Sequence, residues 1–316
     1  MKMSKELFPL KGIVTVLNTP FTRDNRLDLA GLKKNMAYAL KSGVAGFLVP
    51  AMASEVYKLS FDERIALVET ALEEAGTRAV VIGGAGETNP ARRTKMARRL
   101  LQAGCRNLLL QIPFAGEKRF QDDVMRVADL GPAMLMIQDW DFRGNGLPLG
   151  LICRLFEEVD SFRCLKIETV PAGPKYTAVL KATGGRLNVS GGWAVSSMIE
   201  ALERGAHAFM PTGMHEIYCL IYRLFQGGRK PEANEWFTRL LPVLAFSNQH
   251  LDISIHFFKR LLHAQGIYAT SRVRPPIMAF DRFHERHART MIGYAIGLMK
   301  TARACQEGIV CSTRKS

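Results

Sequence analysis

Residues 133–138 read Ala-Met-Leu-Met-Ile-Gln and are apolar at every position before Gln138. A strand that is buried on both faces has this composition, because neither face meets water. Short runs of this kind recur along the chain, and stretches of helix length separate them. The runs occupy residues 13–17, 45–49, 79–83, 107–111, 133–138, 164–168, 188–191 and 208–211. Their alternation with helical stretches predicts a parallel sheet covered by helices.

The stretches between these runs carry the signals with which helices begin and end. Ser60 and Glu63 have the spacing of a capping box. Asp28 is placed to begin the first helix, and Asn89, followed by Pro90, the third. The glycines at which we expect helices to end are Gly43, Gly104 and Gly205. Strand–helix units with such short connections predict an α/β fold, a (β/α)8 TIM barrel. An open, doubly wound sheet is the alternative, but no Gly-rich phosphate-binding turn follows the first run.

The pattern changes after Gln226, where Gly227-Gly228 and Pro231 interrupt the chain and only helical periodicity follows. We expect a C-terminal helical extension with helices at 232–246, 252–265 and 281–307. The predicted organisation is an N-terminal segment at 1–11, the barrel at 12–228, a C-terminal helical region at 229–307 and a tail at 308–316.

The composition is that of an ordinary globular protein, with 47% hydrophobic and 23% charged residues among 316. No apolar run is long enough to cross a membrane, and the first ten residues lack the apolar core of a secretory signal. The 6 cysteines are scattered, without CxxC pairs or zinc-ligand spacing. We therefore expect a cytoplasmic protein with reduced thiols and no membrane partner.

The net charge of +14 raises the question of an anionic partner. The densest basic stretch holds Arg92, Arg93, Lys95, Arg98 and Arg99 on one amphipathic segment. We interpret it as a solvated helix face, because no nucleic-acid-binding motif accompanies the charge. Nucleic-acid binding is therefore not expected.

Active sites of such barrels lie at the C-terminal ends of the strands. The polar residues expected there are Thr19, Ser54, Glu55, Gln138, Asp139, Arg143, Lys166 and Glu168. Lys166 lies inside the run 164–168, where burying an unpaired ammonium is costly and favours the neutral amine. A neutral amine is a nucleophile toward a ketone. The alternative is a structural ion pair of Lys166 with Glu168 or Glu55.

The other polar residues allow fewer interpretations. Arg143 follows the fifth run, and its guanidinium has the shape to bind a carboxylate, although a lone loop arginine more often faces water. Gln138 offers hydrogen bonds but no acid or base. The glycines at 83–86 lack the lysine of a phosphate-binding loop, which favours a tight turn. His215 with Glu216 fits a helix start, and no His/Asp/Glu spacing suggests a metal.

Several pieces of this sequence occur in the same order in one known family. They are Thr19-Pro20-Phe21, Ser54-Glu55, Gly84-Ala85-Gly86, Leu165-Lys166-Ile167-Glu168, and Lys259 with Arg274-Pro275. From about Gly12 to Met299 the chain resembles the dihydrodipicolinate synthase / N-acetylneuraminate lyase family. The resemblance implies a homotetrameric, class I (Schiff-base-forming) lyase that acts on pyruvate or another 2-oxo acid without metal or cofactor.

The resemblance also implies roles for individual residues. Lys166 matches the Schiff-base lysine, and Arg143 matches an arginine that binds a substrate carboxylate. Gln138 stands where the family has its acid/base tyrosine and is grouped with Lys166 as catalytic. The residues expected to bind the substrate are Thr19, Ala53, Ser54, Arg143, Glu168, Gly191 and Pro211.

Departures from the family pattern concern proton transfer. Residues 51–55 read Ala-Met-Ala-Ser-Glu where the family has Gly-Thr-Thr-Gly-Glu, so Met52 and Ala53 replace two hydroxyls. The aromatic residue of the proton relay falls on Ala115. The stretch after Gln138 resembles a Gln-Asp-x-Pro subgroup, although Trp140-Asp141 replaces its proline. A substrate group, a water, Ser54 or Glu168 would then have to transfer the proton.

These observations leave three hypotheses in order. The first is aldol cleavage, aldol condensation or dehydration of a 2-oxo acid through an imine on Lys166. The second is a protein that has lost catalysis and binds a small carboxylic acid as a sensor or structural partner. Nucleic-acid binding is third. The apolar residues Met52, Trp140 and Phe142 are expected at the mouth of the site and favour a less polar or bulkier substrate than a sugar acid.

Overall fold

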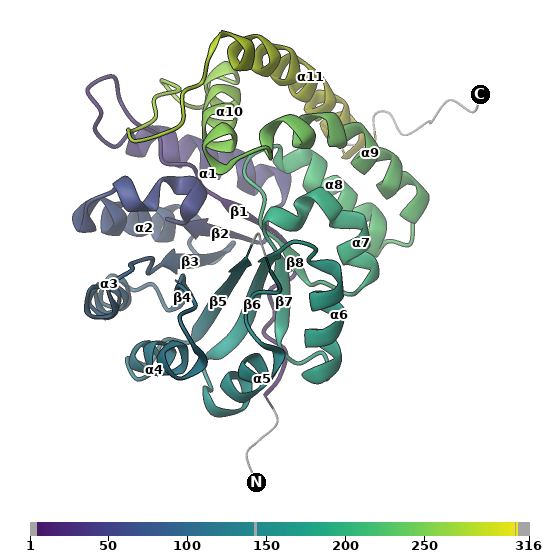
Figure 1. Ribbon diagram of the computed structural model, residues 1–316. Helices are drawn as coiled ribbons and strands as arrows, with labels where there is room; N and C mark the ends of the chain where they lie inside the picture. The colour runs from purple at the N-terminus through teal and green to yellow at the C-terminus, as the bar shows by residue number, and fades with distance from the viewer. Residues whose placement is uncertain (1–4, 142–143, 307, 309–316) are drawn as a thin grey trace.

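The computed structural model describes residues 5–141, 144–306 and 308. Its strands are all parallel, and each one pairs with the next along the chain. They are β1 (Gly12–Val16), β2 (Gly46–Val49), β3 (Val80–Gly84), β4 (Asn107–Leu110), β5 (Met134–Asp141), β6 (Phe162–Thr169), β7 (Asn188–Gly191) and β8 (Ala208–Phe209). β8 pairs with β1 and closes the barrel, which excludes the open sheet and confirms the TIM barrel (Figure 1).

A helix follows each strand around the outside of the barrel. These helices are α1 (Leu29–Ser42), α2 (Phe61–Ala75), α3 (Pro90–Gln102), α4 (Glu117–Ala128), α5 (Leu149–Glu158), α6 (Gly173–Ala182), α7 (Met198–Glu203) and α8 (His215–Gln226). Short 3-10 turns, η1 (Met52–Ser54), η2 (Val56–Lys58) and η3 (Trp193–Ser197), interrupt the connections after β2 and β7. The predicted caps are confirmed: Ser60 and Glu63 form a reciprocal capping box, and Asp28 and Asn89 accept backbone N–H bonds.

The C-terminal extension consists of α9 (Lys230–Ser247), α10 (Leu251–Ala264) and α11 (Arg282–Gln306), close to the predicted ranges. Figure 1 places these helices together on one side of the barrel, next to α1 and α8. α9 packs on α8, and α10 packs on η1. The extension therefore reaches the loop after β2, at the C-terminal end of the barrel. Among the described helices, none has the length and apolarity required to cross a membrane.

Alternation along the strands decides which side chains enter the barrel. Met134 and Met136 of β5 and Cys164 of β6 belong to an apolar cluster in the barrel interior, before the C-terminal ends of the strands. Two residues further along each strand, Gln138 and Lys166 face each other in register. The barrel interior therefore changes from apolar to polar toward the C-terminal ends of β5 and β6.

The basic segment on α3 departs from the expected solvated face. The side chain of Arg93 is only 2% exposed, and its guanidinium lies 3.1 Å from Asp123 Oδ2 on α4. Arg93 Nε also donates to the carbonyl of Glu87 at 3.0 Å. Only part of this stretch faces solvent, because Arg93 fastens α3 to α4 and to the loop that precedes α3.

The glycines after β3 allow close approach between neighbouring segments. A Cβ at Gly84 would lie 1.8 Å from the carbonyl oxygen of Pro50, and one at Gly86 would lie 2.3 Å from Gln111 Oε1. A side chain at either position would displace the loop after β2 or the end of β4. This explains the Gly-rich run as a packing requirement, in agreement with the predicted tight turn.

Candidate active site

A cavity of about 450 Å³ opens at the C-terminal ends of the strands. Barrel side chains form its floor, the loops after β2, β6, β7 and β8 form its walls, and the turn between α9 and α10 covers it. Of the residues predicted from the sequence, Ala53, Gln138, Lys166, Glu168 and Pro211 line this cavity. Its volume lies within the range of small-molecule sites.

Lys166 is paired with Glu168 rather than isolated. Its Nζ lies 2.9 Å from Glu168 Oε1, and the two side chains are 5% and 9% exposed. The expectation of an unpaired amine is therefore wrong, and of the two structural partners considered it is Glu168, not Glu55, that is found. Both groups of the pair nevertheless line the cavity, where a ligand would meet them.

Glu168 accepts hydrogen bonds from donors on three sides. Lys166 Nζ and the backbone N–H of Trp193 reach Oε1, the latter at 2.8 Å. Gln138 Nε2 makes a short contact with Oε2. Both carboxylate oxygens of Glu168 therefore act as acceptors in this arrangement. Glu168 is thus the acceptor at the centre of the site.

A chain of amides fixes the orientation of Gln138. Gln111 Nε2 donates to Gln138 Oε1 at 2.7 Å, so Gln138 presents its NH₂ group to Glu168. Gln138 Nε2 also lies 3.7 Å from the sulfur of Met52. Gln138 therefore acts here as a hydrogen-bond donor that positions Glu168.

Glycine is required where the loop after β7 crosses this pair. A Cβ at Gly192 would lie 1.9 Å from Glu168 Oε1 and 2.5 Å from Lys166 Cε. Gly192 lines the cavity, whereas the predicted Gly191 lies in β7 behind it and is not part of the lining. The role of Gly191 in substrate binding stays a prediction, and Gly192 is the glycine that the structure places at the cavity.

Ser54 and Thr19 lie behind the cavity wall and are not part of its lining. Ser54 Oγ donates to the carbonyl of Leu17 at 2.5 Å and accepts from the N–H of Ala51 at 3.0 Å. Thr19 Oγ1 donates to the carbonyl of Ser54 at 2.6 Å. Since their hydroxyls are engaged with backbone, both residues hold the loop after β2 against the end of β1.

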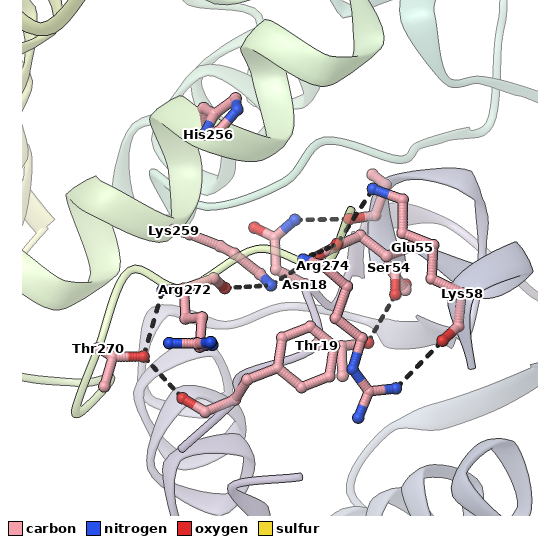
Figure 2. A network of polar contacts seen from close by, with 12 residues as sticks. Asn18, Thr19, Ser54, Glu55, Lys58, His256, Lys259, Thr270, Arg272 and Arg274 are labelled. Atoms are coloured by element: carbon pink, nitrogen blue, oxygen red, sulfur yellow. Dashed lines mark hydrogen bonds and ion pairs between the residues drawn. The ribbon is translucent and has the colours of Figure 1, made fainter. Parts of the chain in front are cut away.

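Figure 2 shows how the same loop is tied to the C-terminal extension through Glu55. Glu55 adopts a left-handed conformation with φ 59°, and its side chain is fully buried. Lys259 Nζ on α10 makes a short ion pair with Oε1, and the N–H of Arg274 donates to Oε2 at 2.9 Å. Lys58 Nζ lies 3.3 Å from the same oxygen. These contacts set the position of Met52 and Ala53, which form the cavity wall just before Glu55.

Burial of Lys259 has an electrostatic consequence. It lowers the pKa of the amine from 10.5 to about 8, and the nearby Glu55 carboxylate opposes that shift. The guanidinium of Arg274 pairs separately with Glu63, which caps α2. The sequence offered Lys259 and Arg274 only as markers of a resemblance, without a role.

Asp139 holds the segment that follows β5. Its Oδ1 accepts from the N–H of Leu147 at 2.8 Å, and its Oδ2 lies 3.0 Å from Lys175 Nζ. Desolvation by burial raises the pKa of Asp139, and Lys175 counteracts this. The predicted Arg143 and Phe142 lie outside the described residues, and Trp140 is not part of the cavity lining.

Several site residues were missed by reasoning from the sequence. Gln111, a polar residue at the end of an apolar strand, carried a signal of the same kind as Gln138. Trp193, Thr212, Asn248 in the turn after α9 and Ser254 in α10 also line the cavity, although no local signal marks them. Within the described residues, no group of three or more His, Cys, Asp or Glu side chains is arranged to hold a metal ion.

Comparison with known proteins identifies the family of the chain. Residues 9–293 match the profile of the Dihydrodipicolinate synthetase family. The chain is 25% identical over 281 residues to an L-2-keto-3-deoxyarabonate dehydratase from Azospirillum brasilense, covering 84% of this chain and 88% of that one. It is also 25% identical over 301 residues to a 4-hydroxy-tetrahydrodipicolinate synthase from Xanthomonas campestris pv. campestris, covering 92% and 96%.

Solved structures share the fold at lower identity. The 4-hydroxy-tetrahydrodipicolinate synthase from Methylacidiphilum fumariolicum SolV superimposes with a TM-score of 0.83 at 17% identity, over 93% of this chain and 98% of that one. A prophage protein of the dihydrodipicolinic acid synthase family from E. coli K12, solved in complex with pyruvate, gives 0.83 at 18% identity, over 92% and 99%.

Proposed function

The chain belongs to the dihydrodipicolinate synthetase family and is a lyase of aldolase or dehydratase type, and on that premise we propose that it works through an imine between Lys166 and a 2-oxo acid. The observation that carries the proposal is the Lys166–Glu168 pair, which is buried and faces the cavity. A nucleophilic amine needs a nearby base to remove its proton, and Glu168 Oε1 lies 2.9 Å from Lys166 Nζ.

The proposed sequence begins with transfer of a proton from the Lys166 ammonium to Glu168. The neutral amine attacks the C2 carbonyl, the carbonyl oxygen takes one proton from the amine nitrogen and one returned by Glu168 and leaves as water, and an iminium remains. Loss of a proton from C3 then yields an enamine, which serves aldol chemistry; loss of a C4 hydroxyl from the same intermediate serves dehydration. Each step needs one acid/base group. Glu168 is proposed to be that group, because the amide of Gln138 cannot act as a general acid or base.

The substrate carboxylate is proposed to lie against the loop of Met52 and Ala53. Because Met52 and Ala53 have no side-chain hydroxyl, this loop can bind the substrate carboxylate only through backbone N–H groups. Arg143, by resemblance, is proposed as a second carboxylate ligand. Pyruvate is the simplest candidate substrate, and the relative solved with pyruvate supports a small 2-oxo acid at this site. Assembly as a homotetramer and a cytoplasmic location stay predictions.

Borohydride reduction followed by mass spectrometry tests the proposal. Incubation with pyruvate or a panel of 2-oxo acids should give a covalent adduct on the Lys166 peptide, and Lys166→Arg should abolish it. Lys175→Arg is the matched control, because Lys175 is a half-buried lysine that also pairs with a carboxylate, yet it lies outside the cavity lining. No adduct with any acid, or an adduct that survives Lys166→Arg, would overturn the proposal.

A further inference from the structure

The cavity extends well beyond the Lys166–Glu168 pair. Its volume of about 450 Å³ exceeds what pyruvate alone requires. A 2-oxo acid bound to Lys166 would therefore extend a substituent on C3, here called the tail, into the remaining space. The side chains around that space decide which tail the site accepts, if the imine proposed above forms.

Large apolar side chains surround the space for the tail. Val170 follows β6, while Trp193 and Val195 belong to η3. Leu251 and Phe258 of α10 lie on the covering side. Met52 and Met210 complete this lining from the loops after β2 and β8. A tail in this space therefore contacts hydrocarbon or aromatic surface on several sides.

The described lining offers no free cationic partner for a charged tail, and Arg143, which lies outside the described residues, is proposed above for the carboxylate on C1. Lys166 supplies the only lysine or arginine side chain of that lining, and that amine is paired with Glu168. The Nδ1 atom of His250 is engaged, since it accepts the N–H of Asp252 at 3.1 Å at the start of α10. Burial of a second carboxylate or a phosphate without a partner is strongly unfavourable.

The polar side chains at the cover are largely engaged within the protein. Asn248 donates to Ser196 Oγ at 2.8 Å and accepts from Ser247 Oγ at 3.1 Å. The remaining polar lining residues include Thr212, Tyr218, Gln249 and Ser254, which can pair with an isolated hydroxyl. A tail with hydroxyls on successive carbons would also place some of them against the apolar side chains of the wall, where they have no partner, which disfavours binding.

From these contacts we infer that the natural 2-oxo acid carries an uncharged, predominantly apolar tail, such as an aromatic or branched aliphatic group. This inference rests on the proposed imine on Lys166 and adds the substrate class. If the enzyme cleaves a carbon–carbon bond, the released carbonyl compound is then a neutral apolar aldehyde. The site is thereby distinguished from one that is built for sugar acids or dicarboxylates.

Trapping with borohydride ranks the tails without requiring knowledge of the bond that breaks. The probes are 2-oxo-4-phenylbutanoate for an apolar tail, 2-oxoglutarate for a charged one and a 2-keto-3-deoxypentonate for a hydroxylated one. The concentration for half-maximal labelling of Lys166 should be about tenfold lower for the apolar probe than for the other two. Equal or tighter labelling by either polar probe overturns the inference.

Pyruvate distinguishes this failure from failure of the imine itself. If pyruvate labels Lys166 while the polar probes outrank the apolar one, the tail inference fails and the imine proposal stands. If pyruvate and all the other probes leave Lys166 unlabelled, both fail.

A substitution in the wall gives a second, independent readout. Val195→Thr keeps the shape but adds a hydroxyl to the tail space, so half-maximal labelling by the apolar probe should need about tenfold more acid, with pyruvate unchanged. Val44→Thr is the matched control, because Val44 and Val195 are each 6% exposed and Val44 lies outside the cavity lining. An unchanged preference in Val195→Thr, or the same shift in Val44→Thr, contradicts the inference.

Discussion

Lys166 Nζ and Glu168 Oε1 lie 2.9 Å apart on residues that are two positions apart in β6. Strand alternation turns both side chains to the barrel interior, and the position near the end of the strand brings both to the cavity. The same spacing on a helix would turn them away from each other. The parallel barrel thus supplies an amine and a carboxylate partner from a single short segment.

Glu168→Gln should separate imine formation from proton transfer. The amide keeps the size of the side chain but accepts no proton, so exchange of the pyruvate C3 hydrogens in D₂O should slow by about 10²–10⁴-fold. Borohydride should still trap an adduct, at a reduced rate. Nuclear magnetic resonance measures the exchange. Glu87→Gln is the control, since Glu87 has the same 9% side-chain exposure but pairs with Arg64 outside the cavity lining. Equal exchange rates in Glu168→Gln and the wild type would remove Glu168 from the mechanism.

Gln138→Leu should impair the reaction less than loss of Glu168. The substitution removes one donor to the Glu168 carboxylate and leaves Gln111 Nε2 without its acceptor. We expect the C3 exchange rate to fall about tenfold, the scale of one lost hydrogen bond to a charged group. Gln111→Leu should give a smaller effect, because Gln111 only orients Gln138. Gln265→Leu, whose amide donates to Tyr38 instead, is the control. A larger loss in Gln111→Leu than in Gln138→Leu would contradict this order.

The buried pair of Lys259 and Glu55 should dominate the stability of the loop that forms the cavity wall. Lys259→Met removes the amine that donates to Glu55 whether or not that amine is charged, and it leaves the buried carboxylate without this partner, which should lower the free energy of unfolding by about 3–5 kcal/mol. The double variant Glu55→Gln/Lys259→Met removes both charges and should recover part of that loss. Denaturant titrations measure both values. A double variant that is less stable than Lys259→Met would show that the charges act separately.

The same pair should make the free energy of unfolding depend on pH in the alkaline range. Because burial lowers the pKa of Lys259 from 10.5 to about 8, the unfolded chain binds this proton more tightly than the folded one. The stability contributed by this group is therefore fully present above pH 10.5 and is lost as the pH falls through about 8. Relative to Glu55→Gln/Lys259→Met, the free energy of unfolding of the wild type should rise between these values. A difference that is flat or falls with pH would refute the assignment.

Ser54→Ala should reduce stability rather than affinity for the 2-oxo acid. The buried hydroxyl bridges the carbonyl of Leu17 and the N–H of Ala51, so its loss should cost about 1–3 kcal/mol. Half-maximal labelling by pyruvate should shift little. Thermal unfolding and trapping are the two measurements. Weakened labelling at unchanged stability would instead place the Ser54 hydroxyl on the substrate.

The sequence was sufficient for the barrel and for its central lysine. Apolar runs such as 133–138 identify strands locally, and a lysine inside such a run, as in 164–168, is conspicuous because burial of charge is costly. Because the strands of a parallel barrel all point the same way, the ends of the runs 133–138 and 164–168 were then expected at the same end of the barrel. The strand limits differ by a few residues, as at β8, where the predicted 208–211 shortens to Ala208–Phe209.

The remaining features depend on packing between distant segments. The loop after β7 approaches the Lys166–Glu168 pair through Gly192, and no local pattern distinguishes that glycine from Gly191. Arg92 and Arg93 are neighbours in one basic stretch, and the sequence does not predict that Arg93 is buried while Arg92 is exposed. The difference arises from the contact of Arg93 with Asp123 on α4. The turn between α9 and α10 belongs to the C-terminal helical extension, to which the sequence assigned no part in the site, yet this turn lines the cavity.

A crystal structure of the protein soaked with pyruvate tests the central claim most directly. Continuous density between Lys166 Nζ and C2 of the ligand is predicted, with the Glu168 carboxylate next to C3 and the carboxylate of the ligand against the Met52–Ala53 loop. A ligand that occupies the cavity while Lys166 keeps its ion pair and forms no bond to carbon would contradict it.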